Sequence, residues 1–488
     1  MRPLEILLAV ANLVALIVLA VPVRGRARWA RQSALLPLLV MGVQLLVEGP
    51  RWQMLPAYVL SGLLLVAFLF RLRPSRSGHE PGRRSPARRI AVGLGLGALG
   101  GFVLIAVLLP VILPVFNFPV PTGQYGIGTV TYHWVDNGRP EIFTPTPADH
   151  RELMAQVWYP AEKHQTSKRD PYVHDVDFST TARKLGHLPP FFLDHLRYVV
   201  TNAQPSVAMA DKGTRFPVLI FSPGRGGYRS VNTYQVEELV SHGYVVVGID
   251  QPYSVADVAF PDGRHVPLDQ RVVDFQSDGQ DGPFKLAVDQ VLGQDAVFAL
   301  NQAATLDRSD PHGILTGRLD VDHVGVFGSS LGGITTAEAC RMDRRFRACL
   351  GLDQAMPAAV VRSGLRQPIM WIVRGGTSDR TDEGWKPLAT KELDTSVRSL
   401  YDRLPGDGYL VSIPKMFHSD ITDFPNLMVQ PFAGWAGLTG PGDWQQTHAA
   451  INAYSLAFFD KYLKGTPAPL LDGLAKQYPE VLFETRLS

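Results

Sequence analysis

Cysteines and metal-binding patterns are scarce in this chain of 488 residues, which holds only two cysteines. Two are too few for a framework of disulfides. Cys340 and Cys349 both lie in apolar surroundings, so we expect buried thiols, and a single bridge between them is the alternative in an oxidising compartment. No H-E-x-x-H or C-x-x-C pattern occurs, so the sequence predicts no metal site.

Lysine is absent from residues 1–120, which hold 13 arginines and three glutamates and so carry a net charge of +10. Because the whole chain carries +2, the remainder carries −8. A basic half can indicate a nucleic-acid partner. Here the arginines lie between long apolar runs, so we exclude nucleic acid and expect the partner to be a lipid bilayer.

Apolar runs fill the N-terminal part of the chain, and Pro37 and Pro56 fall in or beside the two shorter ones. The first and last runs are long enough to span a bilayer, which takes about 20 apolar residues. Several arginines directly follow the first run, which favours an anchor over a cleaved leader. We therefore expect a membrane region over residues 1–118 with about four transmembrane helices. The runs are Leu4–Val23, Ala34–Val47, Met54–Phe70 and Ile90–Phe116.

The loops between these runs predict an orientation. The loop after the first run has four arginines, the loop after the second has one, and the loop after the third has seven. Basic loops stay in the cytoplasm. We therefore expect both termini outside the cytoplasmic membrane, with the large C-terminal domain on the extracytoplasmic side.

A glycine pattern, Gly95-x-Gly97-x-x-Gly100, lies in the last run and also occurs in dinucleotide-binding folds. No strand precedes it and no acidic residue follows about 20 positions later, so we expect no organic cofactor. Gly93, Gly97 and Gly101 recur every four residues instead, which predicts a helix face that packs closely against another helix in lipid.

Strands and helices alternate after about Pro121, over a domain that we place at residues 119–488. This alternation predicts a mostly parallel sheet with helices on both faces. The expected strands are Ile127–Trp134, Glu152–Trp158, Val218–Phe221, Tyr244–Asp250, Ala348–Asp353, Pro368–Val373 and Gly408–Ile413, and the expected helices are Val236–Ser241, Phe284–Leu306 and Thr447–Leu463.

Residues 170–210 interrupt that alternation. Within them, Leu188–Val200 is strongly apolar and has few charges. We expect a helix packed on the core here. The alternative is a cap over the active site that also touches lipid.

Residues 323–340, HVGVFGSSLGGITTAEAC, contain a G-x-S-x-G pattern between a short apolar strand and a helix. That context predicts a nucleophile elbow, in which the central serine stands exposed at a strained turn. The central serine is Ser330. Gly328 and Gly332 would leave room for the close approach of strand and helix, and Ser329 is small for the same reason.

A serine nucleophile needs a base, and the base needs an orienting carboxylate. In α/β-hydrolases these follow the serine in the chain order acid and then histidine. Only His418 and His448 follow Ser330. His418 lies in a loop just after the last strand and is the expected base. His448 lies within the final helix, where we expect a histidine on the helix surface.

Two aspartates compete for the role of the acid. Asp353 ends the strand after the elbow helix, and Asp379 follows the next strand, so position alone does not choose between them. A buried carboxylate among Leu350, Leu352 and Met356 is costly unless it serves a partner. In the polar loop around Asp379, by contrast, an exposed aspartate is unremarkable. The chemical setting therefore favours Asp353.

Three segments, FGSSLGG, LGLDQAMPA and FHSDITDFP, together resemble the platelet-activating factor acetylhydrolase family of calcium-independent, lipase-like enzymes. Members combine a G-x-S-x-G-G elbow with L-D-x-x-M-x-P and H-x-x-x-x-D-F segments. The resemblance implies an α/β-hydrolase fold with Ser330 as nucleophile, Asp353 as acid and His418 as base, the last followed by Asp423. It covers residues 120–465.

The segment FPVLIFSPGRGGYRS looks like the oxyanion strand and loop of the same family. The resemblance implies that the backbone N–H groups of Arg225 and Leu331 form the oxyanion hole. Many members have His-Gly where this chain has Pro223-Gly224, and a hydrophobic residue where it has Arg225. The implied substrates are short-acyl phospholipids or similar small esters.

Taken together, these features predict a membrane-anchored serine ester hydrolase that uses no metal or organic cofactor. The same catalytic set would also serve a serine peptidase or a polyester hydrolase, because fold and triad define mechanism better than substrate. A catalytically silent sensor or binding module is the alternative from another class. The presence of Ser330, Asp353, His418 and an oxyanion loop argues against a protein without catalytic activity.

Overall fold

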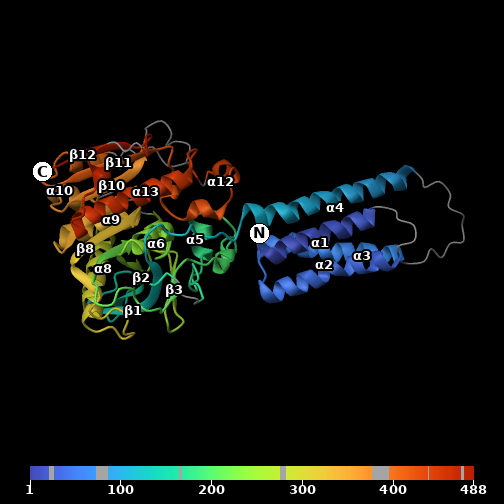
Figure 1. The fold of residues 1–488 in the computed structure, drawn as a ribbon, viewed down its shortest axis with the longest axis horizontal. Helices are drawn as coiled ribbons and strands as arrows, with labels where there is room; N and C mark the ends of the chain where they lie inside the picture. Colours follow the sequence, from blue (N-terminus) through green and yellow to red (C-terminus); the bar gives the residue numbers. More distant parts are fainter. Residues whose placement is uncertain are drawn as a thin grey trace, which may run out of the picture. The chain divides into compact units, whose positions relative to one another are not determined.

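The chain divides into two compact units (Figure 1). The N-terminal unit comprises Met1–Phe116 and Asn426–Phe432, and the C-terminal unit comprises Asn117–Pro425 and Ala433–Ser488. The computed structural model describes residues 1–20, 27–72, 86–163, 168–274, 282–375, 395–437, 439–473 and 477–487.

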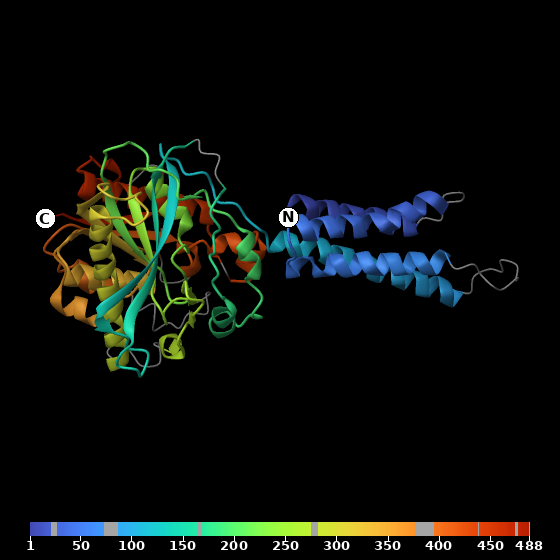
Figure 2. The same cartoon turned by 90° about the horizontal axis from the view of Figure 1, so that it is seen from below.

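Long helices that run side by side make up the described part of the N-terminal unit (Figures 1 and 2). They are α1 (Pro3–Ala20), α2 (Ala27–Val47), α3 (Leu55–Leu72) and α4 (Pro86–Ile112), with the short 3-10 turn η1 (Trp52–Met54) before α3. Their inner faces meet in an apolar cluster to which each helix contributes, for example through Leu8, Val40, Leu60 and Ala106. Apolar packing therefore holds this unit together internally.

Polar side chains are nevertheless buried in this unit while large apolar ones cover its surface. Arg51 is 4% exposed and donates to both carboxylate oxygens of Glu5, at 2.6 and 2.7 Å. Asn12 and Ser61 are also buried, with Ser61 Oγ 2.9 Å from Asn12 Oδ1. This distribution is the reverse of that expected for helices that face water. The exposed apolar side chains include Ile6, Leu13, Ile17, Leu39, Leu46, Val59, Leu63, Leu104 and Ile105.

Among the described residues, one helix is long and apolar enough to cross a bilayer, with its apolar window at Trp52–Leu69. The apolar helical stretches Pro3–Leu19, Leu35–Val47 and Gly97–Ile112 are shorter. One helix of this kind is weak evidence for a membrane protein. The four expected spans therefore stay a prediction.

The predicted close packing of glycines on α4 is wrong where it can be examined. A Cβ atom added at Gly97 or Gly101 would meet no atom within 4 Å. At these two positions α4 therefore does not pack closely against another helix in the described part of the unit. The surroundings of Gly93 lie outside the described residues.

A ten-stranded mixed sheet forms the centre of the C-terminal unit, in the order β12-β11-β10-β9-β8-β4-β5-β2-β1-β3. Its strands are β1 (Gly126–Pro140), β2 (His150–Ala161), β3 (Gln204–Pro205), β4 (Phe216–Ser222), β5 (Val245–Asp250), β8 (Leu319–Ser329), β9 (Phe346–Leu352), β10 (Ile369–Gly375), β11 (Gly408–Pro414) and β12 (Leu482–Arg486). Neighbouring strands from β5 across to β11 pair in parallel, whereas β1–β2, β2–β5 and β11–β12 are antiparallel. The sheet is mostly parallel, as predicted.

Helices cover both faces of this sheet (Figure 2). On one face, α8 (Pro283–Arg308) and α9 (Leu331–Met342) share an apolar cluster with alternate strand residues such as Ile220. On the other face lie α6 (Thr233–Ser241) and α13 (Trp444–Phe459), where the Phe459 ring is 6.0 Å from that of Phe327. Successive strand side chains point to opposite faces, so strands buried on both sides are continuously apolar.

Shorter elements complete the described structure. The seven strands and three helices predicted from the sequence all fall on observed elements, while β3, β12 and the β6–β7 hairpin were not predicted. The shorter elements are α5 (Ser179–Lys184), β6 (Asp257–Ala259), β7 (His265–Pro267), α7 (Gln270–Val273), α10 (Ala358–Ser363), α12 (Phe432–Trp435), the 3-10 turns η2 (Asp194–Tyr198), η4 (His418–Ile421), η5 (Phe424–Leu427) and η7 (Pro469–Leu471), and the π-helical turn η6 (Asp460–Lys464) that extends α13.

The helix predicted at Leu188–Val200 is wrong. This segment consists of turns followed by the single short 3-10 turn η2. Pro189 and Pro190 explain the difference, because proline disfavours helical backbone at the residue before it and removes a helical hydrogen bond. Leu196 is buried while Phe191 is 46% exposed.

Cys340 and Cys349 form a disulfide, with their Cα atoms 6.6 Å apart. The expectation of two buried thiols is therefore wrong, and the alternative expectation, a single disulfide bridge, is confirmed. Cys340 lies near the end of α9 and Cys349 on β9, which runs back beside β8, so the turn between helix and strand brings the two sulfurs together. Such bridges persist in oxidising compartments.

Candidate active site

A strained turn joins β8 to α9 at Ser330. Its backbone has φ 55° and ψ −116°, a conformation that residues other than glycine rarely adopt. A Cβ atom at Gly328 would lie 2.3 Å from the carbonyl oxygen of Gly332, and one at Gly332 would lie 1.9 Å from that of Ser222. Both positions therefore require glycine. The backbone has the strand, sharp turn and helix that the G-x-S-x-G pattern predicts.

The two adjacent serines have different environments. Ser329 is fully buried, and its hydroxyl lies 3.2 Å from Oδ1 of Asn232. Ser330 is half-buried, and its backbone N–H donates to the carbonyl of Leu352 at 2.8 Å. Ser329 therefore helps to hold the turn, while the side chain of Ser330 retains access to solvent.

The loop after β4 passes directly against this turn. A Cβ atom at Gly224 would lie 3.2 Å from the Cβ of Ser330. Gly226, with φ +68°, donates its N–H to the carbonyl of Ser254 at 2.9 Å and so fixes the loop. Arg225 lies between these glycines, and Leu331 is the first residue of α9, where N–H groups have no intrahelical partner. The two residues that the family resemblance proposes for the oxyanion hole therefore flank Ser330 in the fold.

Asp353 and His418 meet at the same edge of the sheet. Asp353 directly follows β9, has φ 49° and is 2% exposed. His418 begins η4, shortly after β11. Nδ1 of His418 lies 2.6 Å from Oδ2 of Asp353, which is hydrogen-bond distance. The competing acid, Asp379, lies outside the described residues.

Arg374, near the end of β10, is a site residue that the sequence analysis missed. Its Nε lies 2.7 Å from Oδ2 of Asp353, and its backbone N–H donates to Oδ1 at 3.2 Å. Both side chains are almost fully buried. The signal was present in the segment PIMWIVRGG, because a charged residue at the end of an otherwise apolar, buried strand needs a partner.

These contacts determine the charge states of the pair. Burial alone would raise the pKa of Asp353, but the Arg374 cation and the His418 hydrogen bond outweigh it and hold that pKa at about 2. Burial lowers the pKa of His418 below its usual value of 6.5, and the cations of Arg374 and Arg225 lower it further, against the opposing effect of Asp353. At neutral pH the arrangement is an ionised carboxylate beside a neutral imidazole.

The segment that carries His418 is anchored to the start of α6. Asp423 is buried and accepts the backbone N–H groups of Thr233 at 2.8 Å and Tyr234 at 3.2 Å. Asn232, which contacts Ser329 through Oδ1, donates through Nδ2 to the carbonyl of Ile421 at 2.7 Å. A single asparagine thus connects the serine turn to the histidine segment.

His448 is not on the helix surface as predicted. It is 7% exposed, and its Nε2 lies 3.0 Å from the carbonyl oxygens of both Asp420 and Thr422. Its ring stacks on that of Tyr234, with centroids 3.6 Å apart. Burial lowers the pKa of His448 to about 4, so it is neutral at physiological pH. The prediction failed because α13 packs beneath the His418 segment.

An apolar cluster adjoins the serine turn through Leu331. It combines residues from α7, α8 and the segments that precede β2 and α7, and two of its rings, Phe143 and Tyr253, stack at 4.7 Å. Its buried members are Phe143, Leu268, Val272, Val288, Leu292 and Leu331.

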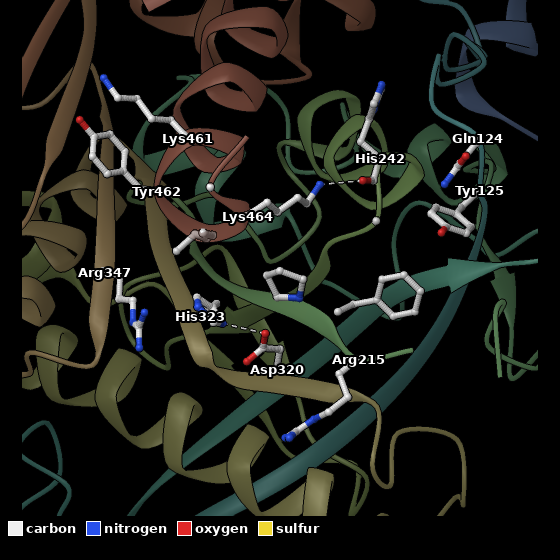
Figure 3. A pocket seen from close by; sticks show the side chains of 15 residues that line it. Gln124, Tyr125, Arg215, His242, Asp320, His323, Arg347, Lys461, Tyr462 and Lys464 are labelled. Atoms are coloured by element: carbon white, nitrogen blue, oxygen red, sulfur yellow. Dashed lines mark hydrogen bonds and ion pairs between the residues drawn. The ribbon is translucent and has the colours of Figure 1, made fainter. Parts of the chain in front are cut away.

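No group of three or more histidine, cysteine, aspartate or glutamate side chains that could hold a metal ion occurs in the described parts of the chain. A separate cavity of about 640 Å³ lies at the opposite edge of the sheet, where β4 and β8 begin (Figure 3). Basic side chains that line it contact acidic ones, such as Arg215 with Asp307 at 2.7 Å and His323 with Asp320 at 2.8 Å. We assign it no role.

We expect Ser330, and not Ser329, to react with a fluorophosphonate probe. Ser330→Ala should abolish labelling, because it removes the hydroxyl at the tip of the strained turn, the expected nucleophile. Ser329→Ala should retain labelling, since it removes only a buried hydrogen bond to Asn232. In-gel fluorescence of the purified variants, with thermal unfolding as a folding control, measures both. Labelling that survives Ser330→Ala but disappears in Ser329→Ala would contradict the assignment.

A family model described as "Platelet-activating factor acetylhydrolase, isoform II" matches residues 117–273. A "Probable 1-alkyl-2-acetylglycerophosphocholine esterase" of Arthroderma benhamiae is 28% identical over 396 residues, which cover 75% of this chain and 94% of that protein. The "Platelet-activating factor acetylhydrolase" of Cavia porcellus is 25% identical over 271 residues, covering 51% of this chain and 58% of that protein.

A solved structure, titled as a ferulic acid esterase from Streptomyces cinnamoneus, matches with a TM-score of 0.59 and 28% identity. The match covers 76% of this chain and 99% of the esterase. These comparisons support the resemblance to the platelet-activating factor acetylhydrolases, and they identify the chain as a carboxylic ester hydrolase.

Proposed function

We propose that the chain is a membrane-anchored serine esterase in which Ser330, His418 and Asp353 form a catalytic triad. The observation that carries the proposal is the buried Asp353–His418 pair, 2.6 Å apart, at the same sheet edge as the strained turn of Ser330. Serine hydrolases need this combination, because a serine hydroxyl becomes an effective nucleophile only when an oriented base removes its proton.

In the proposed reaction, Ser330 Oγ attacks the ester carbonyl while neutral His418 accepts the hydroxyl proton. Asp353 accepts the other imidazole N–H and stabilises the imidazolium that forms. The backbone N–H groups of Arg225 and Leu331 bind the negatively charged oxygen of the tetrahedral intermediate. The imidazolium then gives its proton to the departing alcohol, and water hydrolyses the acyl-enzyme by the same steps in reverse.

We propose short-acyl phospholipids, or similar small esters, as the substrate class. The printed names of the two similar proteins, an alkylacetylglycerophosphocholine esterase and a platelet-activating factor acetylhydrolase, support this choice. Esters of aromatic acids are a second candidate, because the matched solved structure is titled a ferulic acid esterase and the stacked rings of Phe143 and Tyr253 lie in the cluster beside Leu331.

We further propose that the N-terminal unit lies in the cytoplasmic membrane and holds the esterase on its extracytoplasmic side. The exposed apolar side chains of α1 to α4, around buried Glu5, Asn12, Arg51 and Ser61, support insertion in lipid, where polar groups turn inward. The arginine counts of the loops support the orientation. The Cys340–Cys349 disulfide supports an oxidising location.

We expect the full chain in detergent to hydrolyse 4-nitrophenyl acetate faster than the longer 4-nitrophenyl esters, and to release acetate from an acetylated glycerophosphocholine. Asp353→Asn should lower kcat about 10⁴-fold, the scale seen when a triad aspartate loses its charge. Asp379→Asn is the matched control and should stay within about tenfold of wild type, since it removes no transition-state contact. A larger loss in the Asp379 variant than in the Asp353 variant would refute the assigned acid.

The pH dependence of kcat/KM should show an acid limb of one proton centred below pH 6.5. His418 acts only when neutral, and its pKa is lowered, so activity persists below the usual histidine range and is lost as pH falls through the lowered value. Asp353, with a pKa of about 2, stays ionised throughout. The Asp353→Asn variant lacks the carboxylate charge that raises the pKa of His418. The acid limb of its remaining activity should therefore lie at a still lower pH than in wild type. A limb above pH 6.5 in wild type is the contrary result.

Reporters fused near Arg84 and at the C-terminus should report opposite sides of the membrane. Alkaline phosphatase, which is active only outside the cytoplasm, should work at the C-terminus and fail near Arg84, while green fluorescent protein should give the reverse pattern. The expectation follows from the seven arginines of the third loop. The same side for both fusions would exclude the proposed topology.

A further inference from the structure

The side chain of Arg225 is held in a fixed position at the proposed active site. Its Nη1 donates to the carbonyl oxygens of Val272 at 3.2 Å and Val273 at 2.9 Å, the last two residues of α7. A guanidinium is planar and rigid, so these two bonds also fix the direction of its other donors. Both use Nη1, which leaves the N–H groups on Nε and Nη2 uncommitted within the described residues.

This guanidinium lies on the reacting side of the sheet edge. The residue before it, Gly224, is in van der Waals range of Ser330, since a Cβ atom there would lie 3.2 Å from the serine Cβ. Its positive charge is also close enough to His418 to lower the pKa of the imidazole. Val272, whose carbonyl accepts from Nη1, belongs to the same apolar cluster as Leu331, the residue after Ser330. A group bound to Arg225 would therefore lie on the same side of the fold as an ester held at Ser330.

Arg225 differs from other arginines near the site in having no carboxylate partner. Arg374 lies 2.7 Å from Asp353, and Arg271 lies 2.9 Å from Asp269. No carboxylate of the described residues is within ion-pair distance of Arg225. Burial lowers the pKa of Arg225, and this effect outweighs the nearby charge of Asp274, which raises it. A partly buried cation is costly unless a partner compensates its charge.

We infer that the missing partner is supplied by the substrate: the site takes esters that carry an anionic group, a carboxylate or a phosphate, which pairs with Arg225. The inference rests on the proposed function and narrows its substrate class. The anion has two possible sources, the acyl part of the ester or its alcohol part. In either case a charge-assisted, bidentate contact would favour the anionic ester over a neutral one of the same shape.

Two pairs of esters, assayed with the full chain in detergent, distinguish these sources. In the acyl pair, the 4-nitrophenyl half ester of adipic acid is compared with 4-nitrophenyl hexanoate, which replaces the carboxylate by a methyl group. In the alcohol pair, 1-acetylglycerol 3-phosphate is compared with 1-acetylglycerol. The measured quantity is the ratio of kcat/KM for the anionic ester to that for the neutral ester. We expect a ratio of about ten or more in one pair.

Substitution of Arg225 tests whether this side chain causes the preference. Arg225→Met should reduce the ratio to near one, because it keeps an unbranched side chain of the same length up to the Nε position and removes the charged guanidinium. Arg225→Lys should give an intermediate ratio, since it keeps the charge but not the planar donor pair. Arg347→Met is the matched control, because Arg347 is exposed and lines the cavity at the opposite edge of the sheet, and it should leave the ratio unchanged.

Each result has one meaning. A preference in either pair that falls in Arg225→Met supports the inference and identifies the source of the anion. A ratio near one in both pairs, or a preference that persists in both Arg225 variants, overturns the inference while leaving the esterase proposal standing. If wild type hydrolyses none of the four esters, the proposed function fails and the inference fails with it. Fluorophosphonate labelling of each variant checks that it is folded.

Discussion

The buried charge of Asp353 is the constraint on which the catalytic end of the sheet depends. A carboxylate in the protein interior is tolerated only if partners replace the water it loses. Arg374 supplies a cation and a backbone N–H, and His418 supplies a further hydrogen bond. Since Asp353 follows β9 and Arg374 lies on β10, the pairing holds only while these strands keep their register, which the bond from Asp353 N–H to the Ile372 carbonyl also requires.

The start of α6 has a comparable role on the other side of the histidine. Asn232 contacts both Ser329 and the carbonyl of Ile421, and the Asp423 side chain accepts the first N–H groups of the helix. His448 packs against the same segment from α13. Asp353 after β9, the start of α6, and α13 therefore fix the position of His418 together, although its own segment is only a short 3-10 turn.

Much of the C-terminal fold could be predicted because its strands are buried on both faces and so form continuous apolar runs. The elbow could be predicted because Gly328 and Gly332 have no room for a side chain. The pairing of Arg374 with Asp353 and the burial of His448 could not, since each depends on which distant elements become neighbours. The helix expected at residues 188–200 does not form, because the two prolines near its start disfavour helical backbone despite the apolar composition of the segment.

The bridge between Cys340 and Cys349 links the helix that follows Ser330 to the strand that precedes Asp353. Residues 340–349, part of the chain between nucleophile and acid, are thereby closed into a small covalent ring that joins a helix layer to the sheet. Partial opening of the native state commonly proceeds by detaching one such layer at a time. The disulfide ties the end of the elbow helix to the strand that leads to Asp353. Local unfolding of either element, as measured by hydrogen exchange, is therefore coupled to unfolding of the other. Reduction of the disulfide would remove this coupling.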